Sequence, residues 1–255
     1  MRKRGLIAKM KVIRKIAEKN RDVFCGRPAC IAFFGDSVTQ GCFELYQTSE
    51  ATLQTVFDQS SAYHEYLKKR LSEIFPASPV VIVNAGISGD NATQALGRLD
   101  RDVLSFKPDL VVLCFGLNDC ASGLQGISTY KNSMTRIIRS AIESGAEVIV
   151  MTPSAYADHV SIHVKNESQK YPFVSRCIEG IVDLENQGVL DAYVEAAREV
   201  AKETGVPLCD VYARWKRLKE QGADVAELLA NKANHPTREM NRLFADMLLL
   251  TMIDN

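Results

Sequence analysis

Short apolar runs alternate with longer helical stretches along this chain, and this alternation constrains the fold more than any other feature. The run LVVLCF at 110–115 is apolar at every position, which is typical of a strand buried on both faces of a parallel sheet. Strands are predicted at 30–34, 79–84, 109–115, 147–152 and 206–210. Helices are predicted at 61–75, 91–105, 128–144, 190–204, 211–221 and 237–253. The pattern predicts an α/β fold with a doubly wound, parallel, five-stranded sheet and helices on both faces.

The start of the chain is basic, although the chain as a whole is neutral. It has 31 Lys and Arg against 31 Asp and Glu, so its net charge gives no reason to expect a nucleic-acid partner. Ten of these basic residues, but only Glu18 and Asp22 among the acidic ones, fall within residues 1–27. Apolar residues recur there at helical spacing, at Leu6, Met10, Ile13 and Ala17. We therefore expect a basic amphipathic N-terminal helix or extension at 1–28, followed by a single domain at 29–255.

Three roles fit the N-terminal helix: docking on the domain, engaging a partner, or weak contact with an anionic membrane surface. Its apolar runs are short and interrupted by Lys or Arg, so no export signal is expected. The sequence contains no run of roughly 20 apolar residues, the length that a transmembrane segment needs. The seven cysteines form no CxxC pair, and an odd number without an export signal favours the reducing cytoplasm. We expect a cytoplasmic protein.

Polar motifs follow three of the predicted strands, and a fourth precedes the last helix. Ser37 lies in Gly-Asp-Ser after the first strand, Gly89 in Ile-Ser-Gly-Asp after the second, and Asn118 in Gly-Leu-Asn-Asp after the third. His235, followed by a proline, comes just before the last predicted helix. Ligands of a doubly wound sheet bind beyond the C-terminal ends of its strands. We therefore expect these four residues to meet at one edge of the sheet.

These residue types together can break an ester bond. A serine hydroxyl becomes a nucleophile when a histidine takes its proton, and the resulting oxyanion needs hydrogen-bond donors aimed at it. Ser37 is the candidate nucleophile and His235 the candidate base. The main-chain N–H groups of Ser37 and Gly89 and the side-chain amide of Asn118 are the candidate donors.

The four motifs, in this order, resemble those of the SGNH hydrolases, also called GDSL esterases or lipases. Gly-Asp-Ser at 35–37, Gly89, Gly-Leu-Asn-Asp at 116–119 and His-Pro at 235–236 match the family's blocks and span nearly the whole chain. The resemblance implies a flavodoxin-like sheet, catalytic Ser37 and His235, and an oxyanion hole of Ser37, Gly89 and Asn118. It also implies hydrolysis of esters or thioesters without a metal or other cofactor.

The chain departs from the family pattern at Lys232, where the family normally has an aspartate that orients the catalytic histidine. A lysine cannot accept a hydrogen bond from the imidazole. In a serine triad, loss of the carboxylate lowers turnover by about 10⁴. Three explanations remain open: Asn231, Asn234 or a main-chain carbonyl orients the ring; Asp224 or another acid does so; or the chain is a weak enzyme or a binding protein.

Two long segments and one histidine cluster call for separate interpretations. Residues 42–60 and 153–189 follow strands at the expected active edge, where long connections often form lids or substrate walls. Tyr46 and Tyr156 within them are placed to line a substrate cleft. The spacing of Asp158, His159 and His163 raises the rival hypothesis of a metal site, although a polar loop is the more ordinary interpretation.

The sequence thus predicts a serine esterase that cleaves carboxylic esters through an acyl-serine intermediate. We expect a small-molecule ester as the partner, with a small acyl group on a carbohydrate or similar polar alcohol. The alternatives are a lysophospholipase or thioesterase of the same fold, which the basic N-terminal helix would suit. A catalytically weak carbohydrate- or lipid-binding protein, favoured by Lys232, is the third possibility.

Overall fold

A five-stranded parallel sheet forms the centre of the protein. The computed structural model describes residues 10–49, 52–168 and 170–255. The strands of the sheet are β1 (Ala29–Gly35), β4 (Val80–Gly86), β5 (Leu110–Cys114), β6 (Glu147–Met151) and β7 (Leu208–Cys209). They pair in the order β4-β1-β5-β6-β7, and every pair is parallel. The predicted doubly wound fold is confirmed, and the strand order is that of a flavodoxin-like sheet.

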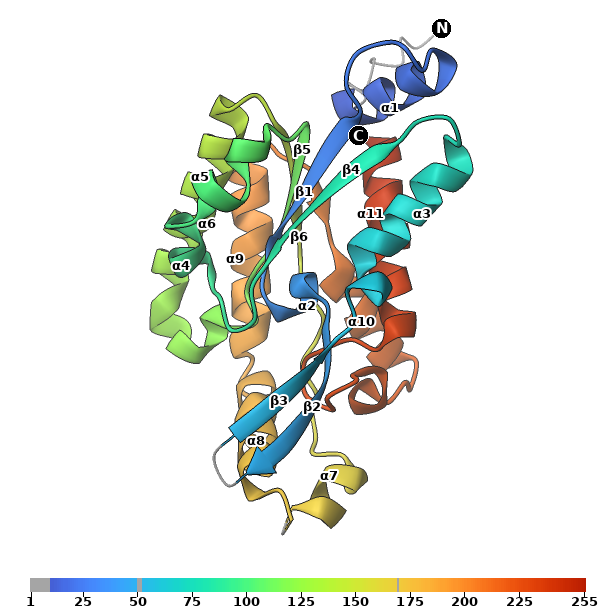
Figure 1. Cartoon of the computed structure of the whole chain (residues 1–255). Coiled ribbons are helices and arrows are strands. Elements are labelled where there is room, and N and C mark those ends of the chain that lie inside the picture. The colour runs from blue at the N-terminus through green and yellow to red at the C-terminus, as the bar shows by residue number, and fades with distance from the viewer. Residues whose placement is uncertain (1–9, 50–51, 169) are drawn as a thin grey trace, which may run out of the picture.

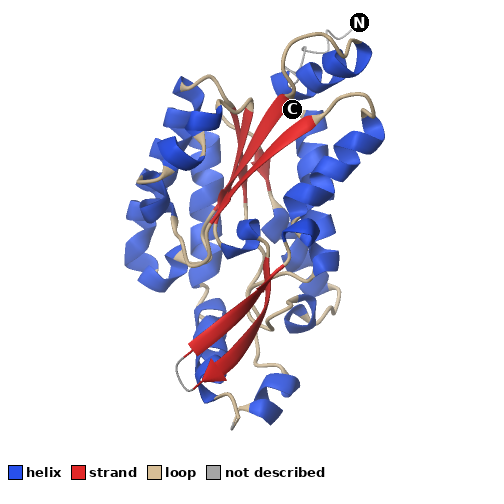
Figure 2. Cartoon of the chain, viewed as in Figure 1, coloured by secondary structure: helices blue, strands red, loops and turns tan. Residues whose placement is uncertain are grey.

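Helices cover both faces of this sheet, as Figures 1 and 2 show. One face carries α3 (Tyr63–Ile74), α10 (Val211–Glu220) and α11 (Arg238–Asp254). The other carries α4 (Ala92–Leu96), α5 (Leu99–Asp102), α6 (Ile127–Glu143) and α9 (Val189–Thr204). Because both faces are covered, β1 and β5 are buried at every position, which explains their continuous apolar sequences.

The single helix predicted over 91–105 is wrong. The chain forms α4, breaks at Gly97 and Arg98, and continues as α5 and a 3₁₀ turn at Leu104–Phe106. Glycine has a low helix propensity, so ending the helix beside it costs little free energy. The side chain of Arg98 is buried and bonds the main-chain carbonyls of Gly35 and Ala85, contacts that the apolar periodicity of the segment did not reveal.

The two long segments form a lobe that projects beyond the C-terminal ends of the strands (Figure 1). The first folds into a hairpin of β2 (Cys42–Ser49) and β3 (Thr52–Phe57), and the second includes α7 (Ile162–Glu167) and α8 (Pro172–Asn186). Gln47 joins them, because its Oε1 accepts hydrogen bonds from the N–H groups of Phe173 and Val174 in the first turn of α8. We call the hairpin, α7 and α8 the projecting lobe.

The described part of the basic N-terminal segment is a helix, α1 (Lys11–Arg21), which docks at the opposite end of the sheet (Figure 1). Val12 and Ile16 are buried, and the carboxylate of Glu147 accepts the N–H groups of Lys11 and Val12 at 2.8 Å each. Residues 1–9 of the predicted extension lie outside the described residues. Membrane contact stays a prediction. Within 10–49, 52–168 and 170–255, no helix has the length and apolar character needed to cross a bilayer.

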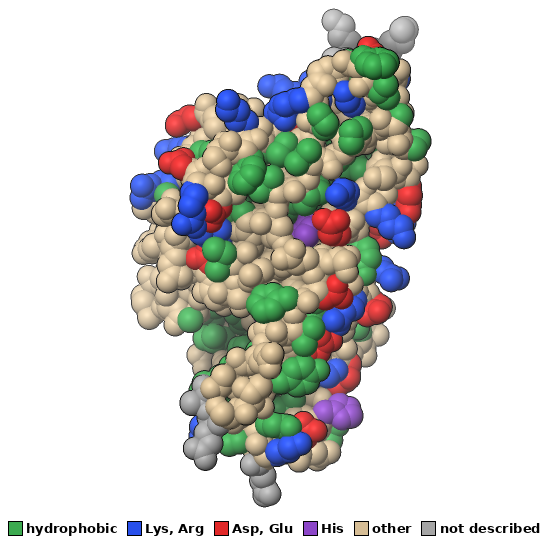
Figure 3. Space-filling view, in the orientation of Figure 1, with side chains coloured by type: hydrophobic (Ala, Val, Ile, Leu, Met, Phe, Trp, Pro, Cys, Tyr) green, Lys and Arg blue, Asp and Glu red, His purple; other side chains and the backbone are tan. Residues whose placement is uncertain are grey.

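On the face of the molecule drawn in Figure 3, acidic and basic side chains are interspersed. That face therefore carries charges of both signs rather than a basic stripe, the usual electrostatic footprint of a nucleic-acid-binding surface.

Candidate active site

Ser37 lies where β1 ends and a short helix, α2 (Ser37–Gln40), begins. Asp36 precedes it and caps α2 by accepting the N–H of Val38 at 3.0 Å. Gly35 is the last residue of β1, and it has no room for a side chain because a Cβ there would lie only 2.7 Å from the carbonyl oxygen of Cys114. This tight turn presents Ser37 at the C-terminal edge of the sheet, where the residue is buried.

The structure brings His235 to Ser37 across 198 positions of sequence. Its Nε2 lies 3.0 Å from Ser37 Oγ, and the imidazole is buried. The turn that carries it is held by Asn231, whose Oδ1 accepts the main-chain N–H groups of Ala233, Asn234 and His235. Asn231 therefore stabilises the turn, and the hydrogen-bond partner of His235 Nδ1 is a different residue.

That partner is the main-chain carbonyl of Phe43, in β2. It lies 2.9 Å from His235 Nδ1. A carbonyl can only accept a hydrogen bond, so the neutral ring carries its proton on Nδ1 and turns the lone pair of Nε2 toward Ser37 Oγ. Burial lowers the pKa of His235 from its ordinary value, while the Phe43 carbonyl acts in the opposite direction. The ring is thus kept in the form and tautomer that a general base requires.

Lys232 and Asp224 lie away from this arrangement. Lys232 has a left-handed backbone, with φ of 59°, and its Nζ pairs with Glu227 at 2.7 Å. Asp224 caps a 3₁₀ turn through the N–H of Ala226, and its Oδ2 lies 3.6 Å from Nε2 of His159. Of the three explanations for the missing aspartate, the geometry favours orientation of His235 by a main-chain carbonyl.

The candidate oxyanion donors lie at the ends of three adjacent strands. Gly89 follows β4 and Asn118 follows β5, the two strands that flank β1 and Ser37. Gly89 has φ of 80°, and apart from its two chain neighbours no residue has a heavy atom within 4 Å of where its Cβ would be, so that side of Gly89 is open. Asn118 donates one amide hydrogen to the carbonyl of Asp90 at 2.8 Å, which leaves its other amide hydrogen for a substrate.

Two buried carboxyl groups brace the loops around Ser37. Burial raises the pKa of Asp36 to about 7 and that of Asp119 to about 6. Asp119 accepts the N–H of Ala92 at 3.1 Å and so ties the loop after β5 to the start of α4. These contacts show that Asp36 and Asp119 hold the loops in place through main-chain N–H groups.

In the long connection at 153–189, Asp158 and His159 form ion pairs with neighbouring side chains. Nδ1 of His159 lies 2.8 Å from Asp158, whose other carboxylate oxygen pairs with Lys219. Among the residues that the structure describes, no group of three or more His, Cys, Asp and Glu side chains is arranged to hold a metal ion.

A pocket of about 240 Å³ lies between β2, α7, α8 and residues 230–232, next to the turn that carries His235. Its apolar lining includes Leu45, Val164, Val174 and Ile178. Tyr46 lines this pocket, whose lining includes neither Ser37 nor His235, so its place in a substrate cleft stays a prediction. Tyr156 does not line the pocket, because it is buried and its hydroxyl donates to the carbonyl of Leu117.

Comparison with known proteins identifies the family. The sequence profile of the GDSL-like Lipase/Acylhydrolase family matches residues 33–243. The chain belongs to this family. An acetylxylan esterase of Geobacillus stearothermophilus is 30% identical over 89 residues, which are 35% of this chain and 39% of the relative. An arylesterase of Vibrio mimicus is 29% identical over 113 residues, 41% of this chain and 55% of the relative. The matches thus span roughly half or less of these two relatives.

The solved structures support the family fold over nearly the whole chain. The crystal structure of an acetylxylan esterase from Geobacillus stearothermophilus superimposes with a TM-score of 0.64, covering 89% of this chain and 95% of that one. Their sequence identity is 19%, so this likeness concerns the fold.

Sequence reasoning missed Phe43, because every residue has a main-chain carbonyl and no side-chain signature could have singled it out.

Proposed function

We propose that this protein is a serine esterase that hydrolyses carboxylic esters through an acyl-Ser37 intermediate. The observation that carries the proposal is the 3.0 Å contact between His235 Nε2 and Ser37 Oγ, with Nδ1 of the same ring held by a carbonyl. A nucleophile within hydrogen-bond reach of an oriented base is the signature of nucleophilic catalysis. Membership in a family of lipases and acylhydrolases supports the same chemistry.

The reaction proceeds in two halves. His235 Nε2 takes the proton of Ser37 as Oγ attacks the ester carbonyl carbon, and the N–H groups of Ser37 and Gly89 and the amide of Asn118 stabilise the oxyanion. His235 then gives its proton to the departing alcohol, leaving the acyl group on Ser37. In the second half His235 takes a proton from water as the water oxygen attacks the acyl carbon. It then returns that proton to Ser37 Oγ as the acid leaves, which restores the free enzyme.

A main-chain carbonyl serves this cycle less well than a carboxylate would. The imidazolium formed in each half is stabilised by a dipole at Phe43 rather than by a full negative charge, which makes a weaker hydrogen bond. The carbonyl still fixes the tautomer and the ring orientation, which are the roles whose loss damages a triad most. We therefore expect a working Ser-His dyad.

For the substrate, we propose a small acyl group on a carbohydrate or a similar polar alcohol. Similarity to an acetylxylan esterase, in sequence over part of the chain and in fold over most of it, supports this choice. The second candidate is a lysophospholipase or thioesterase. The apolar lining of the pocket between the projecting lobe and residues 230–232 favours it, because Leu45, Val174 and Ile178 would suit a longer acyl chain.

The first experiment compares hydrolysis of p-nitrophenyl acetate and p-nitrophenyl octanoate by the wild-type protein, by Ser37→Ala and by Ser88→Ala. Ser88 is a matched control, a serine in the neighbouring loop whose described contact with the site is made by its main-chain N–H. We expect acetate turnover that is lost in Ser37→Ala and kept in Ser88→Ala. A fluorophosphonate probe should label the wild type and not Ser37→Ala.

The outcomes separate the candidates. Preference for octanoate over acetate would replace the deacylase with the lipase or thioesterase. Neither turnover nor labelling in a folded wild-type protein would overturn the esterase proposal and make a binding protein with Lys232 at the family's acid position the leading idea.

A further inference from the structure

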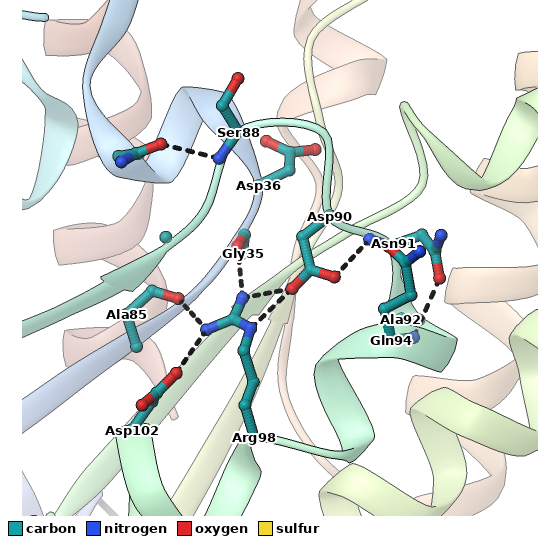
Figure 4. Close-up of polar contacts among 12 residues, drawn as sticks. Gly35, Asp36, Ala85, Ser88, Asp90, Asn91, Ala92, Gln94, Arg98 and Asp102 are labelled. Carbon is teal, nitrogen blue, oxygen red and sulfur yellow. Dashed lines mark hydrogen bonds and ion pairs between the residues drawn. The ribbon is translucent and has the colours of Figure 1, made fainter.

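Arg98 is a buried cation that contacts the C-terminal ends of two adjacent strands, β1 and β4 (Figure 4). Nη1 donates to the carbonyl of Ala85 in β4 at 2.7 Å, and Nη2 donates to the carbonyl of Gly35 in β1 at 3.1 Å. The guanidinium also stacks 4.6 Å from the ring centroid of Phe34. It therefore lies directly behind the turn that presents Ser37.

The same guanidinium holds the loop that contains Gly89. Its Nε donates to Asp90 Oδ2 at 2.7 Å, and Oδ1 of Asp90 accepts the N–H of Asn91 at 2.9 Å (Figure 4). The carbonyl of Asp90 in turn accepts the side-chain amide of Asn118. A line of direct bonds thus runs from Arg98 through Asp90 to Asn118, and Gly89 is the residue next to Asp90.

We propose that Arg98 is a positioning residue for the oxyanion hole. It sets the spacing of the three donors contributed by Ser37, Gly89 and Asn118 through its bonds to Gly35 and Asp90. The inference rests on the proposed esterase function, and it assigns Arg98 a role that the sequence motifs did not indicate.

The chemistry of the side chain explains why an arginine is needed here. A guanidinium presents several N–H groups in a rigid plane, and it reaches two carbonyls and a carboxylate from one position. Lysine at 98 would keep the charge but lose the planar fork. Because donor placement acts on the developing oxyanion, a small displacement weakens the transition state more than the bound ester.

The variants that test this are Arg98→Lys and Asp90→Asn, with Asp102→Asn as the matched control. Asp102 pairs with the same guanidinium at 3.3 Å but also with Arg101, which is mostly exposed, so it lies on the solvent side of the cluster. Asp90→Asn keeps the size of the side chain and removes its charge, which makes it the safer variant for folding.

Each variant is measured with p-nitrophenyl acetate well below its melting temperature, and intact sites are counted by exhaustive fluorophosphonate labelling. For Arg98→Lys and Asp90→Asn we expect kcat per labelled site to fall about 10- to 100-fold, short of the 10²–10³ typical of deleting a donor outright. KM should change by less than about twofold, because ground-state binding is largely spared. Affinity for phenylboronic acid, which forms a tetrahedral adduct with the serine, should fall by a similar factor to kcat. Asp102→Asn should keep both values.

A purely structural role predicts a different result: lower melting temperatures with unchanged kcat per labelled site and unchanged boronate affinity. That result in either Arg98→Lys or Asp90→Asn would overturn the inference. An inactive, unlabelled wild type would instead overturn the proposed function, so the two failures are distinguishable. If Arg98→Lys does not fold, Asp90→Asn decides.

Discussion

His235 is oriented by the main-chain carbonyl of Phe43 at 2.9 Å. Since a carbonyl accepts but cannot donate, the contact dictates the tautomer as firmly as a carboxylate would, without placing a second charge in the buried site. The residue at the family's acid position, Lys232, is paired with Glu227 instead. In this chain, therefore, a main-chain carbonyl rather than a side chain at position 232 contacts His235 Nδ1.

The pH dependence of kcat/KM should report this environment. Burial lowers the pKa of His235 from its ordinary value of 6.5, so the ring remains neutral, and able to act as a base, at a lower pH than an exposed histidine would. We expect the acid limb of the kcat/KM profile to have its midpoint below pH 6.5, with full activity above it. A midpoint above pH 7 would contradict this and indicate a carboxylate beside the imidazole.

Lys232→Asp restores the residue type of the family, yet we expect it not to restore a triad. The His235 Nδ1 proton is already donated to Phe43, and the side chain at 232 is directed toward Glu227. Steady-state kinetics with p-nitrophenyl acetate should give kcat within about threefold of wild type, far from the roughly 10⁴-fold effect of a working triad aspartate. Lys232→Ala is the control for loss of the ion pair with Glu227. A large gain found only with the aspartate would show that the carboxylate reaches the ring.

At the scale of elements, the first residues of β2 are held in place by the start of α11. Arg238 donates to Glu44 at 2.6 Å and to Asp58 at 2.9 Å, and its guanidinium lies 4.3 Å from the ring centroid of Phe43. These bonds keep the pKa of Glu44 below its usual value, so the pair is charged at neutral pH. The hairpin therefore supplies the carbonyl that contacts His235 as well as a wall of the pocket.

Arg238→Met should consequently impair catalysis through β2. Loss of both ion pairs frees the segment around Phe43, and misorientation of His235 is expected to lower kcat about 10- to 100-fold. Arg70→Met is the matched control, because Arg70 also pairs with acids of α3 and α11, including Asp246, but on the exposed surface. Equal kcat values for the two variants, measured at the same temperature below melting, would rule out this role of the hairpin.

At the scale of the whole molecule, α1 and the active site occupy opposite ends of the sheet (Figure 1). Lys19 is buried near the end of α1, and its ammonium group donates to the carbonyls of Val23, Cys25 and Gly26. The ion pair of Lys15 with Asp109 adds a second tie to the sheet. The contacts of α1 are thus suited to stability rather than to chemistry.

Lys19→Met tests this division of roles. The substitution keeps the aliphatic stem but leaves three carbonyls without their donor, which should lower the free energy of unfolding by about 1–3 kcal/mol. Denaturant unfolding measures the loss, and kcat at 25 °C should stay at the wild-type value. A fall in kcat of the folded variant would show that the two ends of the sheet are coupled.

Much of the molecule could be predicted from local sequence. The continuous apolar strands and the helical periodicity predicted the sheet and most helices, because burial on both faces of a parallel sheet leaves a direct mark on residue type. The motifs at Ser37, Gly89 and Asn118 could be placed together for the same reason, since parallel strands end at one edge. The interruption near Gly97 escaped this reasoning because it depends on where the side chain of Arg98 finds its partners.

The sequence by itself thus determined the α/β class, the position of a polar motif after each of three strands, and the expectation that Ser37 and His235 meet. All of these depend on residue type and spacing. Only the tertiary structure decided which group orients His235 and what joins the donor loops. The carbonyl of Phe43 and the contacts of Arg98 with Gly35 and Ala85 involve main-chain atoms, which are the same in every residue. Such partners are selected by position in space, and that position exists only once the sheet and the hairpin have folded.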